Sequence, residues 1–430
     1  MSGFLLRRAI AGLLVGGAAL FAAACGSAPS STGTAAPASS SAAGGTADRT
    51  TALADAQKFA ACMREQGITD WPDPTVGPGG GISIGGPAGS DASASSARAT
   101  CQHFLGTAGP NAAPSSGSNA APPSENTAAG WQTKKPGGDC ECADGSAYSF
   151  FVRTGDPKKV VLFLDGGGAC WSAGTCAQGG GNHFQASVEP PEQGGIFDAG
   201  DARNPFAGHS FVYVPYCTAD VHLGDADTTY AAGLTVHHHG YANGSAALDQ
   251  LVTSFPQATD VVVIGGSAGS VSAPLYAGLV ADRLPKARVT SIADSSGAYP
   301  DAPQMNAILT AKAWNAQALP ADASMPGLVI ATAERHPRIV FARIDHAQDA
   351  VQQSYLRLVG TPSDDVAALL RTNGAQIEKA GVTLHTFTKP GDGHTVVDNE
   401  GFSTEHVAGV SLSDWVTRLI AGRPGADVGP

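Results

Sequence analysis

Charged side chains are scarce in this chain, and no part of it gathers positive charge. Lys, Arg, Asp and Glu make up 14% of the 430 residues, against about a quarter in typical soluble domains. The formal net charge is −12, and the sequence holds no basic run. Proteins that bind nucleic acid gather Lys and Arg into patches. We therefore expect no nucleic-acid partner.

The chain also lacks an apolar run long enough for a comfortable membrane span, which takes about 20 residues. The stretch AIAGLLVGGAALFAAAC follows the short basic start MSGFLLRR, which is typical of a signal peptide, here residues 1–24. Its ending resembles the lipobox of bacterial lipoproteins, so Cys25 is expected to carry a lipid anchor. The alternative is an ordinary secretory signal with an incidental cysteine. Both readings export the protein, the first to the bacterial cell envelope.

Two stretches rich in Ser, Ala, Pro and Gly divide the rest of the chain. Residues 25–50 and 107–136 have too few apolar side chains to fold and are expected to be flexible linkers. Residues 51–106 between them predict a small helical module with two cysteines. Two short helices bury little surface, so a disulfide between Cys62 and Cys101 is the expected staple. Residues 137–430 remain for one large domain.

Past residue 137, short apolar runs alternate with helical patterns. The predicted strands are AYSFFVR, VVLFLD, SFVYVPY, VVVIGG, RVTSIAD, RIVFARI and VTLHTFT. Continuous apolar runs suit a sheet that is covered on both faces. Helical candidates lie at 244–255, 270–284, 363–380 and 411–421. This alternation predicts an α/β fold with a mostly parallel sheet and helices on both faces.

The run VVVIGGSAGS places Ser267 between glycines where a predicted strand meets a predicted helix. This is the setting of a Gly-x-Ser-x-Gly nucleophile elbow. The strained turn needs small neighbours, which Gly265 and Gly269 supply, and the helix N-terminus favours an oxyanion. A plain turn is the alternative, since a short motif recurs by chance in a chain rich in Gly, Ala and Ser.

An acyl-transfer serine needs an oxyanion hole, a base and an orienting acid. The glycines at 166–168 follow the strand VVLFLD and offer backbone N–H groups beside that of Ala268, unless they form only a Gly-rich turn. The base is expected on a loop after the last strand, where His394 lies among glycines. His385, inside that strand, and His406, in the tail, are poorer candidates.

The acid is expected after the preceding strand. Asp345 and Asp349 both stand there, and geometry alone does not choose between them; Asp294, after RVTSIA, is a third option. A lone Asp at a strand end is more often a helix cap than a catalytic group. The order Ser, Asp, His along the chain is nonetheless that of α/β-hydrolases.

Six segments together resemble the pectin acetylesterase/Notum family of α/β-hydrolase-fold carboxylesterases. They are FLDGGGACW, NPFAGHSFVYVPYCTADVHLGDA, HHHGYANGSAALDQL, VVVIGGSAGS, IADSSGAYP and DAVQQSY, and they keep the family's order and spacing over about residues 137–400. The resemblance implies Ser267 as nucleophile and His394 as base. It implies Asp349 as the acid, because AQDAVQ is more similar to the family's Asp segment than RIDHA is.

The same resemblance implies an oxyanion hole formed by the backbone N–H groups of Gly167, Gly168 and Ala268. Two positions depart from relatives: animal members have an aromatic residue where Gly168 stands, and many bacterial members have a cysteine at the position of Gly266. Both departures bear on the identity of the substrate and leave the reaction type as it is.

Four further residues match family segments and are expected to line or brace the substrate cleft: Asp220, His222, His239 and Asn243. The three successive histidines at 237–239 invite a metal site. Adjacent side chains point in different directions, however, and no Cys/Asp set completes a tetrahedron at ligand spacing. We therefore expect structural histidines and no metal.

Seven cysteines remain after Cys25, and in an exported protein they are expected to form disulfides. The family has a bridge that corresponds to Cys170 and Cys176, beside the oxyanion glycines. Cys217 is expected to pair with Cys140 or Cys142. One thiol is left over on either pairing.

These observations together predict an ester hydrolase that works through an acyl-enzyme, without a cofactor and as a monomer. A lipid-tethered esterase on a flexible linker suits a substrate outside the cell, with O-acetylated polysaccharide expected first and a lipid or acylated-protein ester second. A hydrolase-fold binding protein that has lost the reaction is the alternative from another class. A serine peptidase has no positive support beyond the shared triad.

Overall fold

The computed structural model describes residues 39–40, 46–66, 69, 71, 73–76, 82–83, 101, 130–177, 184 and 186–429. The chain divides into two compact units, Met1–Ala120 and Ala121–Pro430, which are described separately. The expected signal peptide, the lipidation residue Cys25 and most of both expected linkers lie outside the described residues. Within the described ranges, no helix has the length and apolar character that crossing a membrane requires.

The first unit is organised around helix α1 (Thr46–Glu65). Its buried side chains recur every three or four residues, as in an amphipathic helix; those described are Ala56, Phe59, Ala60, Cys62 and Met63. Trp71 packs edge-on against Phe59. Three short strands, β1 (Ser39–Ser40), β2 (Thr75–Val76) and β3 (Ile82–Ser83), form a small sheet in the order β1-β3-β2.

The expected disulfide between Cys62 and Cys101 is present in this unit. Cys101 itself is buried, and it belongs to the core cluster around α1. It is the one residue of the expected second helix, SARATCQHFLG, that the structure describes. The bridge joins the helix to a residue 39 positions further along the chain, which suits a unit with so few apolar side chains.

The second unit is built on an eight-stranded sheet in the order β13-β12-β11-β10-β6-β7-β5-β4. Its strands are β4 (Gln132–Lys134), β5 (Phe150–Arg153), β6 (Asp156–Leu164), β7 (His209–Val214), β10 (Asp260–Gly266), β11 (Arg288–Asp294), β12 (Val340–His346) and β13 (Leu384–Lys389). The pairs from β13 to β7 are parallel, and β5 and β4 join antiparallel at one edge. The predicted mostly parallel α/β sheet is therefore confirmed.

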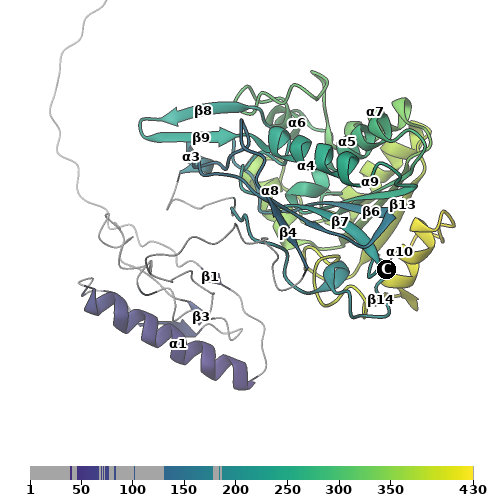
Figure 1. Ribbon diagram of the computed structural model, residues 1–430. Coiled ribbons are helices and arrows are strands. Elements are labelled where there is room, and N and C mark those ends of the chain that lie inside the picture. The colour runs from purple at the N-terminus through teal and green to yellow at the C-terminus, as the bar shows by residue number, and fades with distance from the viewer. Residues whose placement is uncertain are drawn as a thin grey trace, which may run out of the picture. The chain divides into compact units, whose positions relative to one another are not determined.

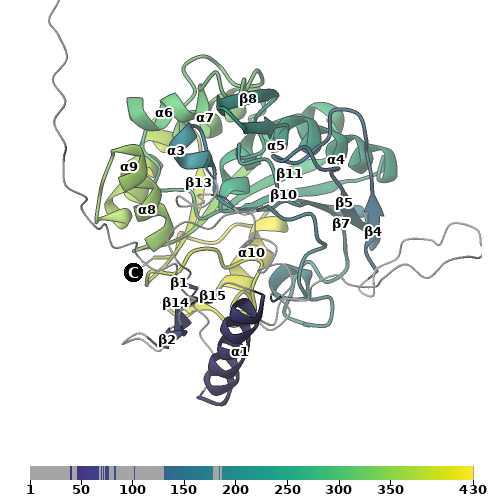
Figure 2. The same cartoon turned by 90° about the vertical axis from the view of Figure 1, so that its left-hand side faces the viewer.

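Helices cover both faces of this sheet, as Figures 1 and 2 show. The predicted helices are α4 (Gly240–Ser254), α5 (Ala268–Arg283), α9 (Val366–Lys379) and α10 (Leu412–Ile420). Side chains of α4, α5 and α9 share a buried cluster with Leu162 and Leu164 of β6. Phe163 of β6 belongs instead to the cluster that includes Trp415 of α10. Because both faces are covered, β6 and β10 each contain a continuous run of buried apolar residues, Val160–Leu164 and Val261–Ile264.

Several elements were not foreseen from the sequence. The helices are α3 (Ala173–Cys176), α6 (Pro303–Leu309), α7 (Met325–Arg335) and α8 (Ala350–Val359). Two antiparallel hairpins also occur, β8 (Ala226–Ala231) with β9 (Leu234–His238), and β14 (His406–Val407) with β15 (Val410–Ser411). Strand β8 alternates between partly buried and exposed residues, so it gives no continuous apolar run in the sequence.

Two more disulfides brace the second unit. Cys170 pairs with Cys176, as the family resemblance implied, and Cys217 pairs with Cys142 rather than with Cys140. Cys140 is the leftover thiol; it is partly buried and donates to the carbonyl of Ala242 over 3.6 Å. Disulfides form and persist in oxidising compartments, so the structure fits a location outside the cytoplasm.

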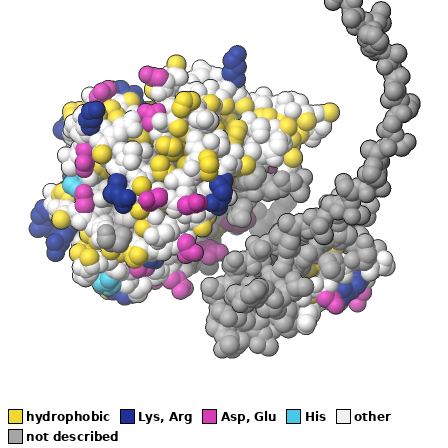
Figure 3. Space-filling model, turned by 180° about the vertical axis from the view of Figure 1, so that it is seen from behind, with side chains coloured by type: hydrophobic (Ala, Val, Ile, Leu, Met, Phe, Trp, Pro, Cys, Tyr) yellow, Lys and Arg dark blue, Asp and Glu magenta, His cyan; other side chains and the backbone are white. Residues whose placement is uncertain are grey.

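Charged side chains on the face shown in Figure 3 lie interspersed by sign, with hydrophobic side chains between them. At physiological salt the field of an exposed charge is screened within about 8 Å, so neighbouring charges of opposite sign leave little net field beyond that distance. On this face, therefore, the net negative charge of the chain is not gathered into one acidic surface.

Candidate active site

Ser267 stands between the end of β10 and the first residue of α5. Its φ of 49° and ψ of −115° are a conformation that residues with a Cβ rarely adopt. The Ser267 N–H donates to the carbonyl of Asp294 at the end of the neighbouring strand β11, over 2.8 Å. Strain of this kind persists only where the surroundings hold it, and this bond to β11 is one of the constraints.

The glycines around Ser267 are required by close backbone contacts. A Cβ on Gly265 would lie 2.2 Å from the carbonyl oxygen of Gly269, and a Cβ on Gly269 would lie 2.1 Å from that of Leu164. Gly266 differs, because the nearest atom to its Cβ would be 3.6 Å away on Phe163. The turn therefore demands glycine at 265 and 269 but leaves room for a side chain at 266.

The hydroxyl of Ser267 belongs to a continuous hydrogen-bonded chain. Its Oγ–H donates to Nε2 of His394 over 2.7 Å. Nδ1–H of His394 in turn donates to Oδ2 of Asp349 over 2.8 Å. An ionised carboxylate only accepts hydrogen bonds, so it fixes the proton on Nδ1 and leaves Nε2 free to take the serine proton. The structure thus brings together the three residues that the sequence singled out.

Asp349 is fully buried, and its two carboxylate oxygens have different hydrogen-bond partners. Its Oδ1 caps α8 by accepting the N–H groups of Val351 and Gln352, at 3.0 and 2.8 Å. Its Oδ2 accepts both His394 and the side-chain amide of Gln352, the latter over 2.9 Å. Donors to the charged form stabilise a carboxylate, and here they also fix the direction in which Oδ2 points.

The two other candidate acids have different partners. Asp345 forms a buried ion pair with Arg343 over 2.8 Å and accepts the N–H of Gly297. Asp294 accepts the N–H groups of Val396 and Val397, at 2.8 and 2.9 Å. Asp294 therefore holds the loop that carries His394 without contacting its imidazole. The geometry separates three aspartates that spacing alone left equivalent.

Asp294 is expected to make stability depend on pH. Burial, assisted by the nearby charge of Asp398, raises the pKa of Asp294 to about 7 from 3.8. The native state then binds this proton more tightly than the unfolded chain does, so its contribution is complete below about pH 4 and is lost as the pH rises through 7. Asp294→Asn is expected to reduce this decline in unfolding free energy, by an amount on the order of 1–4 kcal/mol across the window.

Urea unfolding at pH 4 to 8 measures this dependence. The amide oxygen of Asn can still accept the backbone donors, so the variant should fold. Asp364→Asn removes an exposed carboxylate and serves as the control that leaves the profile in place. Burial also raises the pKa values of Asp165 and Asp345 to about 6, so part of the decline should remain. An unaltered profile in Asp294→Asn would show that this carboxyl is ionised in the native state.

The glycine turn after β6 packs directly on the serine. A Cβ on Gly166 would lie 2.6 Å from the Cβ of Ser267. Gly167 and Gly168 have φ values of 157° and 84°, which favour glycine. Ala268 opens α5, so its N–H is one of the first-turn donors that lack a partner within the helix. These are the backbone positions that an oxyanion hole beside Ser267 requires.

A cavity opens on Ser267 and has mostly apolar walls. Its volume is about 50 Å³. It is lined by Gly168, Ala169, Trp171, Val221, Ser267, Ala268, Val271, Tyr299, Met305, Ile308, Trp314, Met325, Tyr355 and Val359. One water molecule needs at least about 10–15 Å³ of such space. The cavity therefore accommodates a group of a few heavy atoms.

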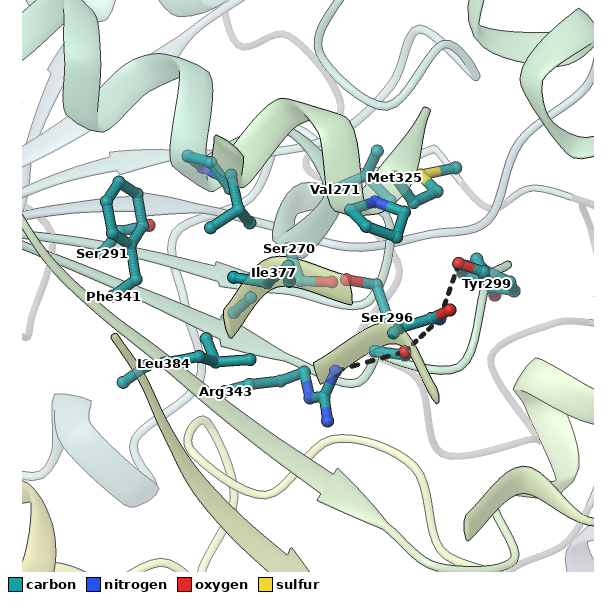
Figure 4. A pocket seen from close by; sticks show the side chains of 17 residues that line it. Ser270, Val271, Ser291, Ser296, Tyr299, Met325, Phe341, Arg343, Ile377 and Leu384 are labelled. Atoms are coloured by element: carbon teal, nitrogen blue, oxygen red, sulfur yellow. Dashed lines mark hydrogen bonds between the residues drawn. The ribbon is translucent and has the colours of Figure 1, made fainter. Parts of the chain in front are cut away.

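A second apolar cavity, also of about 50 Å³, lies beyond the first, between α5, α7 and the strands β11 and β12. Figure 4 shows Val271, Tyr299 and Met325 at one end of it, with Arg343 and Leu384 at the other. Val271, Tyr299 and Met325 line both cavities. These three side chains are therefore the partition between the two spaces.

The four residues expected to line or brace the cleft all contact other groups of the protein. Asp220 accepts from Thr218, from the N–H of His222 and from that of Gly240. Nε2 of His222 lies 2.8 Å from the carbonyl of Asp165, and Asn243 donates to the carbonyl of Glu141. His239 lies beside Asp227. None of the four is among the residues that line the described cavity at Ser267, so here they brace loops.

Sequence reasoning missed two side chains on α8. Gln352 is fully buried and joins Asp349 to the N–H of Ala298. Tyr355 lines the cavity, and its hydroxyl accepts the N–H of Ala169 in the glycine turn. The segment DAVQ carried the signal, because Asp followed three residues later by Gln is typical of a helix N-terminus.

Comparisons with known proteins identify relatives of part of this chain. Residues 133–328 match the family model described as Pectinacetylesterase. The palmitoleoyl-protein carboxylesterase NOTUM of Schmidtea mediterranea is 31% identical over 160 residues, which are 34% of this chain and 29% of that protein. Pectin acetylesterase 5 of Arabidopsis thaliana is 23% identical over 175 residues, 38% of this chain and 40% of that protein. The chain thus spans well under half the length of these relatives.

A solved structure extends the likeness to the fold. The Wnt deacylase Notum from Drosophila superposes with a TM-score of 0.50 and 17% sequence identity. The match covers 68% of this chain and 94% of that one. At this identity the comparison bears on the fold alone, and the fold is a hydrolase-like sheet with covering helices.

Proposed function

We propose that the chain is a serine carboxylesterase of the pectin acetylesterase and Notum family, whose model residues 133–328 match. The observation that carries the proposal is the chain of hydrogen bonds from Ser267 through His394 to Asp349. This arrangement activates an otherwise weakly nucleophilic hydroxyl. The fold supplies it at the carboxyl ends of three parallel strands, where α/β enzymes hold their ligands.

The first half-reaction forms an acyl-enzyme. Oγ of Ser267 attacks the ester carbonyl carbon while Nε2 of His394 takes the hydroxyl proton. The negative charge on the carbonyl oxygen is stabilised by the N–H groups of Gly167, Gly168 and Ala268, each worth about 10²–10³ in rate at comparable sites. The carbon–oxygen bond to the alcohol breaks, and His394 returns its proton to the leaving alkoxide. Asp349 stabilises the imidazolium throughout.

The second half-reaction uses water. His394 removes a proton from a water molecule, whose oxygen attacks the acyl carbon. The bond to Ser267 breaks, the serine regains its proton from His394, and the carboxylic acid leaves. Attack and bond breaking follow the same order as in the first half-reaction, so the same backbone N–H groups stabilise the oxyanion in both. Every group in this cycle belongs to the chain, the substrate or water.

The size of the cavity at Ser267 favours a short acyl group. About 50 Å³ corresponds to three to five water-sized positions, and an acetyl group brings one methyl beyond its carbonyl. O-acetylated polysaccharide is accordingly the first substrate class. The predicted export signal, the anchor at Cys25 and the disulfides favour action on a polymer at the cell envelope.

The second cavity favours an alternative substrate. A longer acyl chain would fit if the partition between the cavities moved, and Met325 has the flexible side chain best suited to that movement. A lipid or acyl-protein ester is therefore the second candidate. The two candidates differ in the acyl length at which hydrolysis is fastest.

A series of p-nitrophenyl esters from acetate to octanoate tests this choice. We expect kcat/KM to be highest for acetate or propionate and to fall steeply by octanoate. Met325→Ala is expected to raise the octanoate-to-acetate ratio about tenfold, because it opens the partition to chains that the first cavity excludes. Met305→Ala removes the same side chain from the first cavity alone and should change the ratio less.

Release of acetate from acetylated pectin or xylan completes the test of the polymer. Equal or faster hydrolysis of octanoate than of acetate by the wild type would favour the lipid or acyl-protein ester. Polymer release without a preference for short chromogenic esters would place specificity in the alcohol part of the substrate and remove the argument from cavity size.

A further inference from the structure

The three successive histidines divide between two sides of the β8–β9 hairpin. Side chains alternate along a strand, so His237 and His238 of β9 point to opposite sides. His239 follows the end of β9, and its ring shares the partner Asp227 with His237. His238 is fully buried, with Nδ1 2.9 Å from the carbonyl of Thr218 and Nε2 2.9 Å from the hydroxyl of Tyr230. The expectation that adjacent histidines diverge holds for neighbours, but it overlooked the pair two residues apart.

Two carboxylates complete the group on the side of His237 and His239. Asp227 lies directly opposite His237 in the hairpin. Glu141 comes from a distant segment, next to Cys142, whose disulfide to Cys217 fixes it in place. The four residues each present one ligand atom, and these atoms all lie within 4.8 Å of one another.

The separations form a closed ring of alternating nitrogen and oxygen atoms. Nδ1 of His237 lies 2.7 Å from Asp227 Oδ1 and 3.0 Å from Glu141 Oε1. Nε2 of His239 lies 3.0 Å and 3.6 Å from the same two oxygens. Four ligands at about 2.0–2.2 Å around a tetrahedral zinc ion stand roughly 3.3–3.5 Å apart. Three of the observed separations are a few tenths of an ångström shorter than that range and the fourth lies just above it, so small side-chain rotations would admit the ion.

We propose that Glu141, Asp227, His237 and His239 form a Zn²⁺ site that joins the β8–β9 hairpin to the segment around Cys142. Two imidazoles and two carboxylates are ligands that zinc accepts in tetrahedral geometry. Four protein ligands leave no open position, which is the pattern of a structural site rather than a catalytic one. The Asp227 side chain is 60% exposed and that of His239 only 13%, so the ion has an approach from solvent.

A zinc ion at this site would stabilise a wall of the cavity at Ser267. The β8–β9 hairpin, visible in Figure 1 as the long ribbon projecting from the body, contacts the segment that carries Trp314. The hydroxyl of Thr228 donates to the carbonyl of Ala313, and the N–H of Asp225 donates to that of Trp314. Trp314 lines the cavity at Ser267. Fixing the base of the hairpin therefore limits the movement of this side chain.

Zinc binding to the chelator-treated full chain tests the proposal. Isothermal titration with ZnCl₂ at pH 7.5 is expected to give one site per chain, and zinc is expected to raise the melting temperature. His237→Ala/His239→Ala is expected to weaken binding at least about 100-fold, beyond what loss of a supporting contact alone produces. It should also abolish the shift in melting temperature. His385→Ala/His406→Ala removes two histidines elsewhere and should bind as the wild type does.

The proposal is overturned if the wild type binds no zinc, or if the His237→Ala/His239→Ala variant binds it equally well. Circular dichroism checks the fold of each variant. Should the double variant not fold, the visible spectrum of the wild type with Co²⁺ decides. Strong absorption from a four-coordinate ion supports the site, and the weak spectrum of a six-coordinate ion contradicts it.

Discussion

The Ser267→Ala variant is expected to lose about 10⁵-fold in kcat for p-nitrophenyl acetate, while its fold and melting temperature stay close to those of the wild type. The substitution removes only the hydroxyl group, which His394 activates through a hydrogen bond. Losing the nucleophile of a triad costs nearly as much as losing the whole triad, because the three groups act as a unit. What remains should reflect binding and the oxyanion donors.

Ser272→Ala is the matched control for this loss. Ser272 also lies on α5 and is buried, and its hydroxyl donates to the carbonyl of Gly269 in its own helix. Its kcat should stay within about tenfold of the wild type. If wild type and Ser267→Ala are equally inert across the whole ester series, the hydrolase-fold binding protein becomes the better reading. If both are equally active, another residue is the nucleophile.

The second large effect is expected from Asp349→Asn, which should lower kcat about 10⁴-fold with little change in KM. The side-chain amide can donate to Nδ1 of His394, and the imidazole proton then moves to Nε2. In that tautomer Nε2 cannot accept the proton of Ser267. The oxygen of Asn can still cap α8, so the loss should come from chemistry rather than from unfolding. Steady-state kinetics and urea unfolding of the same preparation separate the two.

Asp345→Asn is the informative comparison, because the sequence offered Asp345 and Asp349 as equals. Asp345 pairs with Arg343, and losing a buried ion pair costs about 3–5 kcal/mol of stability. Its kcat per folded molecule should nevertheless stay within about tenfold of the wild type. The reverse pattern, with Asp345→Asn inactive and Asp349→Asn active, would show that the acid has been misassigned.

Local constraints made the nucleophile predictable. A strand, a tight turn and a helix follow one another within a few residues, and the turn leaves no room for a Cβ at Gly265 or Gly269. Because this requirement for glycine acts on residues next to Ser267 in the chain, it leaves a short motif that sequence analysis recognises. The buried strands were predictable for a similar reason, since a sheet covered on both faces favours continuous apolar runs such as VVLFL and VVVI.

The acid was harder to identify, because its two roles look alike in the sequence. Asp349 caps α8 through Oδ1 and holds His394 through Oδ2. Capping a helix and holding a catalytic histidine are alternative interpretations of an Asp after a strand, but the side chain of Asp349 has both roles. Spacing could not decide between Asp345 and Asp349, because the decision depends on how β12 and α8 are oriented relative to a loop after β13.

The sequence alone did not predict that Glu141 lies beside the β8–β9 hairpin. Glu141 and Asp227 meet His237 and His239 only because a hairpin folds back against a disulfide-linked segment. Nothing within ten residues of Glu141 indicates the hairpin, and the hairpin itself has only weakly apolar strands. The four residues expected to line or brace the cleft show the same limit, since spacing did not reveal which backbone and side-chain groups they contact.

Covalent labelling directly tests whether the hydroxyl of Ser267 is the nucleophile, because the reagent marks the oxygen that attacks it. The protein is treated with a serine-directed fluorophosphonate, and its intact mass and peptides are then measured. We expect one phosphonyl group per chain, on the peptide that contains Ser267, with loss of p-nitrophenyl acetate hydrolysis in step with labelling. An adduct on another serine, or hydrolysis that survives full labelling of Ser267, would contradict this assignment.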